Sequence, residues 1–103
     1  MKPLKGNKKI DFLFDKGKRC SSEFLSCVFL KQETDVLFYV VSVPKKFFPR
    51  AVDRNKIKRQ LREVIRKNED VFIKNGFGWY MIIFKHSSFV SFDALNKDVC
   101  SLF

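Results

Sequence analysis

The sequence has no long hydrophobic run, and this absence excludes an integral membrane protein with a transmembrane helix. A membrane-spanning helix needs about 18 consecutive apolar residues, whereas the longest apolar runs here, Val36–Val41 and Trp79–Phe84, have only the length of a strand. The first residues also lack the apolar segment of a signal peptide. We therefore expect a cytoplasmic protein with no membrane partner.

Cysteine and histidine are scarce, and the acidic residues are scattered. The three cysteines, Cys20, Cys27 and Cys100, are odd in number and widely spaced, which favours reduced, buried thiols over a disulfide framework. With no Cys-x-x-Cys pair and His86 as the single histidine, there is no basis for a zinc site. A phosphodiesterase needs clustered carboxylates or histidines. We therefore assign no catalytic residue, no metal site and no cofactor to the chain.

Positive charge is what the sequence has in excess. Its 103 residues include 21 Lys and Arg against 11 Asp and Glu, for a net charge of +10, yet 46% of the residues are hydrophobic. This composition predicts one domain, residues 1–103, with a real core. Ten basic and two acidic residues fall within positions 45–67, and seven basic and two acidic within 1–20. Such concentration points to a polyanionic partner, either nucleic acid or an anionic membrane.

Apolar spacing and turn residues predict the elements. A first helix is expected from Asn7, a possible N-cap, to Lys16. Strands at Phe24–Leu30 and Val36–Val43, separated by a polar loop, are typical of an antiparallel hairpin. A long helix is expected to start at an N-cap Asp53 and to continue through Phe72. A buried strand at Trp79–Phe84 and a last helix capped by Ser91 or Asp93 complete the prediction.

The long helix has two different faces at a turn of about 100° per residue. Its apolar stripe contains Ile57, Leu61, Val64, Ile65, Val71 and Phe72. The opposite face carries Asn55, Arg59, Arg62 and Arg66, flanked by Lys56, Lys58 and Lys67. Arginine donates two parallel hydrogen bonds to a phosphate, so this face suits an RNA backbone. The alternative is a solvated face with ordinary ion pairs to Glu63, but one acid cannot neutralise so many cations.

Residues 51–63, Ala-Val-Asp-Arg-Asn-Lys-Ile-Lys-Arg-Gln-Leu-Arg-Glu, resemble the signature of the bacterial ribonuclease P protein subunit. The core of that signature is Arg-Asn-Arg, and Lys56 stands at its second arginine. The preceding Ser-Val-Pro-Lys-Lys at 42–46 is similar to the strand end that precedes the signature in that family. The resemblance covers nearly the whole chain.

The resemblance implies an α+β two-layer sandwich in the order α-β-β-β-α-β-α. Its central sheet would be mostly antiparallel, with a first short strand near Arg19–Ser21. The resemblance also implies a left-handed crossover, whereas the residues alone predict the common right-handed form for a parallel pair joined through the long helix.

The resemblance further implies an accessory subunit of an endoribonuclease whose catalytic centre is RNA, with Mg²⁺ expected in that RNA. The protein would bind ribonuclease P RNA through its basic motif, namely Arg54, Asn55, Lys56, Lys58, Arg59 and Arg62, with Arg66 on the same helix face. A cleft would bind the 5′ leader of precursor tRNA through Phe14, with Ile10, Lys45 and Lys46. Phe12, Phe38 or Tyr39 could add base stacking. No protein partner is predicted.

Two other functions compete with this hypothesis. Charge alone leaves open a generic basic RNA-binding protein, of ribosomal or RNA-chaperone type, without a role in cleavage. Docking on an anionic membrane is disfavoured, because the apolar stripe of the long helix is needed to cover the sheet.

Overall fold

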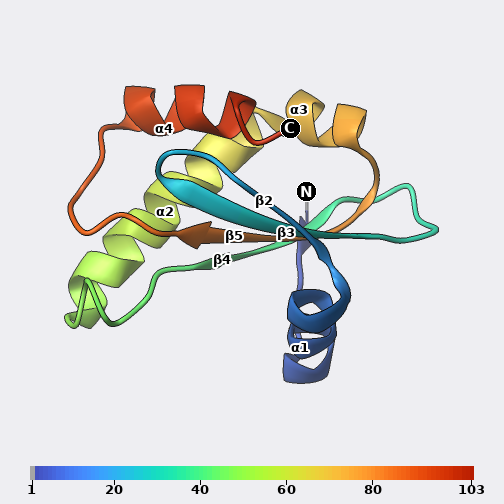
Figure 1. The fold of residues 1–103 in the computed structure, drawn as a ribbon, viewed down its shortest axis with the longest axis horizontal. Helices are drawn as coiled ribbons and strands as arrows, with labels where there is room; N and C mark the ends of the chain where they lie inside the picture. Colours follow the sequence, from blue (N-terminus) through green and yellow to red (C-terminus); the bar gives the residue numbers. More distant parts are fainter. Residues whose placement is uncertain (1) are drawn as a thin grey trace.

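The computed structural model describes residues 2–103, in which five strands form one sheet of order β1-β4-β5-β3-β2 (Figure 1). The strands are β1 (Lys2–Pro3), β2 (Lys18–Ser21), β3 (Leu25–Lys31), β4 (Phe38–Ser42) and β5 (Gly78–Phe84). The helices are α1 (Asn7–Lys16), α2 (Ala51–Lys67), α3 (Glu69–Asn75) and α4 (Phe92–Cys100). The expected order is confirmed, with β1 and α3 as additions.

The pairing of β3 with β4 as a hairpin is wrong. Strand β5 lies between them, antiparallel to β3 and parallel to β4, so that Cys27 faces Ile82 and Tyr39 lies beside Tyr80. The most continuously apolar strand thereby takes the centre of the sheet, where β3 and β4 pair with its two edges and helices cover its faces. Two of the four pairings, β1 with β4 and β4 with β5, are parallel, so the sheet is mixed rather than mostly antiparallel. The handedness of the β4–α2–β5 crossover stays a prediction.

Helices cover both faces of the sheet (Figure 1). Helices α2, α3 and α4 lie on one face, and α1 lies alone on the other, where it contacts β3 and β5. The two-layer description therefore holds for the sheet with α2 and α4, and α1 adds a partial third layer. The side chains of β5 point alternately to the two faces of the sheet. Those of Tyr80, Ile82 and Phe84 are buried beneath α2 and α4. The other β5 side chains, Trp79, Met81 and Ile83, are half-buried on the α1 face.

The predicted helix starts need two corrections. Asn7 lies inside α1, and the N-cap is Gly6, whose φ of 103° suits a residue without Cβ. Helix α2 begins at Ala51 with Arg50 as its N-cap, so Asp53 is in the first turn, where its carboxylate still favours the positive end of the helix dipole. The cap at Ser91 is confirmed, since its hydroxyl accepts a hydrogen bond from the Ala94 N–H at 3.2 Å.

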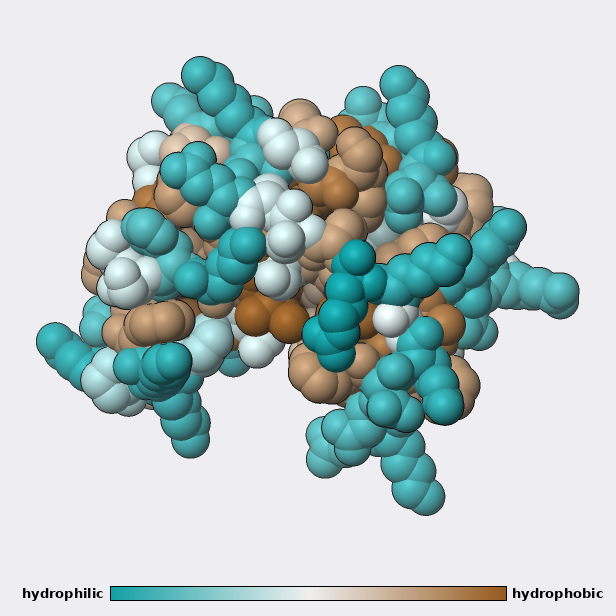
Figure 2. Space-filling model, in the orientation of Figure 1, coloured by the Kyte–Doolittle hydropathy of each residue, from teal (hydrophilic) through white to brown (hydrophobic). Residues whose placement is uncertain are grey.

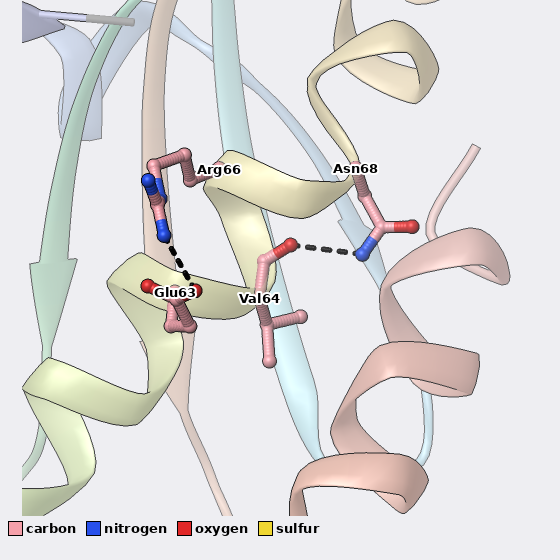
Figure 3. Close-up of polar contacts among 4 residues, drawn as sticks. All are labelled: Glu63, Val64, Arg66 and Asn68. Carbon is pink, nitrogen blue, oxygen red and sulfur yellow. Dashed lines mark hydrogen bonds and ion pairs between the residues drawn. The ribbon is translucent and has the colours of Figure 1, made fainter.

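The long helix does not continue to Phe72 but is interrupted at Asn68 (Figure 3). The Asn68 amide Nδ2 donates to the Val64 carbonyl at 2.8 Å and to Oδ1 of Asn96 in α4 at 2.7 Å. An asparagine side chain that bonds the backbone in this way competes with helix propagation. The bond to Asn96 fixes the end of α2 against α4, and the chain restarts as α3.

The expectation of buried thiols is wrong for Cys100, which is exposed, whereas Cys27 is buried and Cys20 is half-buried. All three are free cysteines. Cys20 and Cys27 lie opposite each other on β2 and β3. A hydrogen bond from the Cys27 thiol lowers the pKa of Cys20 to about 7, against the opposing effect of burial. The same contact, together with burial, raises the pKa of Cys27.

Candidate nucleic-acid interface

Helix α2 has the two faces that the sequence predicts. Ile57, Leu61, Val64 and Ile65 are buried against the sheet. Arg59, Arg62 and Arg66, which we call the arginine face, are exposed. Asn55 and Lys56 are also exposed, and Lys58 is half-buried. The helix therefore presents several cations to solvent while its apolar stripe holds it to the sheet.

The one acid among these cations, Glu63, is engaged by Arg66. Arg66 Nη2 lies 2.6 Å from Glu63 Oε1, on the exposed side of the helix (Figure 3). This hydrogen bond raises the pKa of Arg66. The ion pair joins residues three positions apart in the helix. Arg59 and Arg62 keep their positive charge at the surface.

Tyr39 on β4 lies next to the arginine face. The two border a cavity of about 270 Å³ whose lining is Tyr39, Arg59, Arg62, Glu63, Ile65 and Arg66. Phe38 and Tyr39 were both predicted from the sequence as candidates for base stacking. Successive side chains of a strand point to opposite faces of the sheet, so the two residues lie on different faces. Phe38 packs on the α1 face, whereas Tyr39 packs on the α2 face.

Arg54 differs from the other residues of the basic motif. Its Nη1 donates to the carbonyl oxygens of Phe48 at 2.9 Å and of Pro49 at 2.8 Å. The half-buried guanidinium thereby holds the β4–α2 loop against the start of its own helix. The sequence placed Arg54 among the RNA-binding residues, but in the structure its hydrogen bonds are directed into the protein.

On the α1 face, Phe14 is 46% exposed and Ile10 is half-buried against a small cluster of Leu4, Leu13 and Val28. The guanidinium carbon of Arg19 lies 4.3 Å from the centroid of the Phe14 ring, and Arg19 Nη2 donates to the Phe14 carbonyl at 2.9 Å. Sequence reasoning missed this cation. Its only sequence signal is its position just after the first helix, in the basic segment 1–20.

Lys45 and Lys46 are exposed in the loop between β4 and α2, with Lys46 Nζ 5.4 Å from the centroid of Phe47. In Figure 1 this loop lies beyond one end of the sheet, well to the side of α1, which packs under β3 and β5. The structure therefore does not gather the four residues predicted for the leader cleft into one cluster. Half-buried apolar side chains of the sheet, namely Val40, Met81 and Ile83, belong to the α1 face.

On the face of the molecule that Figure 2 shows, hydrophilic and apolar surface alternate instead of occupying separate halves. Among the residues that the structure describes, His, Cys, Asp and Glu side chains form no group of three or more that could hold a metal ion. Within residues 2–103, no helix combines the length and the apolar character needed to cross a bilayer.

Comparison with known proteins identifies the family. The model of the family described as Ribonuclease P matches residues 1–103. The chain belongs to the ribonuclease P protein family. The ribonuclease P protein component of Clostridium kluyveri is 31% identical over 100 residues, which cover 96% of this chain and 88% of that protein. The component of Acholeplasma laidlawii is 25% identical over 99 residues, covering 96% and 84%.

A solved ribonuclease P protein from Thermotoga maritima superimposes with a TM-score of 0.83 at 25% identity, covering 99% of this chain and 94% of that one. Ribonuclease P proteins are components of an endoribonuclease complex, a ribonucleoprotein that processes tRNA. The arginine face and the α1 face are thus surfaces of a ribonuclease P protein.

Proposed function

We propose that this protein binds the catalytic RNA of ribonuclease P through α2 and assists removal of the 5′ leader from precursor tRNA in the cytoplasm. The observation that carries the proposal is the two-faced α2 helix, with buried Leu61 on one side and the arginine face on the other. The reaction would occur at the RNA, with its Mg²⁺, and no residue of this chain would be catalytic.

The contacts to the catalytic RNA would be mainly electrostatic. Arg59 and Arg62 would each donate paired hydrogen bonds to a phosphate, because the guanidinium plane matches two phosphate oxygens. Asn55, Lys56 and Lys58 would extend this contact along the helix. Arg66 would remain tied to Glu63, and Arg54 would contribute by holding the loop that precedes the helix.

The leader would lie along the α1 face. Exposed Phe14 offers a ring for base stacking, and Arg19 supplies a cation directly over that ring. Ile10 and the half-buried sheet residues provide apolar surface, while Lys45 and Lys46 add positive charge at the far end of the sheet. Stacking with phosphate contacts tolerates any base sequence, as a leader-binding surface requires.

Cleavage of precursor tRNA at low Mg²⁺ by a bacterial ribonuclease P RNA, with and without this protein, tests the proposal. We expect stimulation by the protein that increases with leader length, and no cleavage by the protein alone. Cleavage without RNA would contradict the assignment of no catalytic residue. Absence of stimulation would overturn the proposal in favour of a generic RNA-binding protein.

A matched pair of variants sharpens this test. Arg59→Ala removes a cation from the arginine face, and Lys74→Ala removes an exposed cation from α3. We expect Arg59→Ala to weaken binding to ribonuclease P RNA and Lys74→Ala to leave it nearly unchanged. Equal losses in both variants would indicate an effect of net charge and not of this surface.

A further inference from the structure

A second cavity adjoins α2 where the β5–α4 loop meets it. Its volume is about 600 Å³, and it is lined by Lys56, Arg59, Gln60, Glu63, Phe89, Val90, Ser91 and Phe92. Arg59 borders both this cavity and the one beside Tyr39. The cavity thus shares Lys56 and Arg59 with the basic motif, whereas its aromatic side comes from outside the motif and away from the α1 face.

The main aromatic surface of this cavity is exposed yet held in place. Phe89 is 51% exposed, and its ring centroid lies 5.3 Å from that of buried Phe48, which in turn packs 5.8 Å from Phe84. Gln60 Nε2 donates to the Val90 carbonyl at 2.9 Å, which ties the loop to α2. The ring is therefore a preformed platform, and preorganisation of this kind reduces the entropic cost of binding.

Cations accompany the aromatic rings at this cavity. Lys56 Nζ lies 5.2 Å from the Phe89 centroid, and Lys67 Nζ lies 5.1 Å from the Phe92 centroid. Arg59 also lines the cavity, and the acid that lines it, Glu63, is engaged by Arg66. Exposed rings beside cations are the arrangement by which proteins hold single-stranded nucleic acid, with a base on the ring and its phosphate on the cation.

We propose that this cavity binds an unstacked nucleobase of RNA on the Phe89 ring, with the adjoining phosphate held by Lys56 and Arg59. The inference rests on the proposed function, because it assumes that α2 faces RNA. It adds a base-stacking site in the β5–α4 loop beside α2, a helix otherwise expected to contact only the RNA backbone. The excess of cations at the cavity favours RNA over an apolar protein partner.

The test compares two labelled single strands of equal length, oligoadenylate and an abasic strand with the same number of phosphates, by fluorescence anisotropy. In Phe89→Ala we expect oligoadenylate affinity to fall roughly 5- to 100-fold, since stacking on an aromatic ring contributes that much per base. Binding of the abasic strand should not change. Phe89→Tyr, which keeps the ring, and Ile73→Ala, which removes an exposed apolar side chain from α3, should both bind oligoadenylate normally.

A second measurement covers the case in which Phe89→Ala disturbs the packing on Phe48. In a Phe89→Trp variant that also carries Trp79→Phe, the indole at position 89 is the only tryptophan, and we expect oligoadenylate to quench its emission. The same oligonucleotide should leave the emission of Ile73→Trp, made in the same Trp79→Phe chain, unchanged. Absence of quenching at position 89 would overturn the proposed stacking.

The outcomes separate this inference from the proposed function. Equal losses for the oligoadenylate and the abasic strand in Phe89→Ala would leave only charge at the cavity and overturn the base-binding site. If Phe89→Ala bound oligoadenylate normally while Arg59→Ala bound ribonuclease P RNA more weakly, the base-binding site at the cavity would be overturned and the proposed function would stand. No loss in either variant would overturn both.

Discussion

Arg54 Nη1 lies 2.9 Å from the carbonyl oxygen of Phe48 and bonds Pro49 as well, although Arg54 sits in the basic motif. These hydrogen bonds stabilise the loop that precedes α2, so the Arg54 guanidinium has a structural role. Arg54 and Arg59 are five residues apart on α2, yet one faces a loop of the protein and the other faces solvent. The motif thus combines residues with different roles.

Replacing Arg54 by alanine should therefore destabilise the protein. We expect Arg54→Ala to lower the free energy of unfolding by about 1 to 3 kcal/mol, because two charge-assisted hydrogen bonds are lost. Arg59→Ala, an exposed substitution on the same helix, should stay within about 0.5 kcal/mol of the parent. Urea denaturation of both variants measures this difference, and equal stabilities would contradict the structural role of Arg54.

Leu61 tests the buried face of α2. Its side chain is fully buried in the main core. We expect Leu61→Ala to lower the free energy of unfolding by about 2 to 5 kcal/mol, since it leaves a cavity under the helix. Arg62→Ala should instead reduce RNA binding without unfolding the protein. The reverse pattern, measured by thermal unfolding and RNA titration, would reject this orientation of α2.

Salt should weaken binding to ribonuclease P RNA steeply. About six phosphate contacts release enough counterions to lower affinity roughly 10³-fold between about 50 and 200 mM salt. Arg62→Ala should reduce the slope of log affinity against log salt by about 1. A filter-binding or anisotropy titration at four salt concentrations measures both, and a flat response would count against any RNA-binding role.

Asp98 joins α4 to the turn between β2 and β3. Its carboxylate accepts hydrogen bonds from the Ser22 hydroxyl at 2.5 Å and from the N–H groups of Glu23 and Phe24, each at 3.1 Å. We expect Asp98→Ala to lower the free energy of unfolding by roughly 2 to 3 kcal/mol, because these donors lose their charged partner. Glu33→Ala, in an exposed loop, serves as the control in urea denaturation. An equal effect of the two substitutions would refute the bracing role of Asp98.

Cys20 should react with iodoacetamide in a pH-dependent manner. Its pKa of about 7 means that the reactive thiolate forms as pH rises through neutrality. In Cys27→Ala the hydrogen bond that stabilises this thiolate is gone, so the midpoint of the rate profile should move to higher pH. Mass spectrometry of the peptide that contains Cys20 measures the rate, and an unmoved midpoint would contradict the contact.

Features that depend only on residues close along the chain can be predicted from the sequence. The spacing of Ile57, Leu61 and Ile65 set the buried face of α2, because helical period places residues four apart on one side. The N-cap at Ser91 is equally local, because its side chain accepts a hydrogen bond from the N–H of Ala94, three residues further along the chain. The basic motif was visible as a run of residues, and it led to the family directly.

Features that join distant segments arise only from tertiary packing. Placement of β5 between β3 and β4 depends on burial of a whole strand, and the end of α2 depends on the bond from Asn68 to Asn96. The platform at Phe89 exists because Gln60, 30 positions away from Val90, ties the loop down. The local sequence pattern does not predict which distant segments will pack together. The free energy that favours one such pairing over another arises only when surfaces from distant segments are buried against each other.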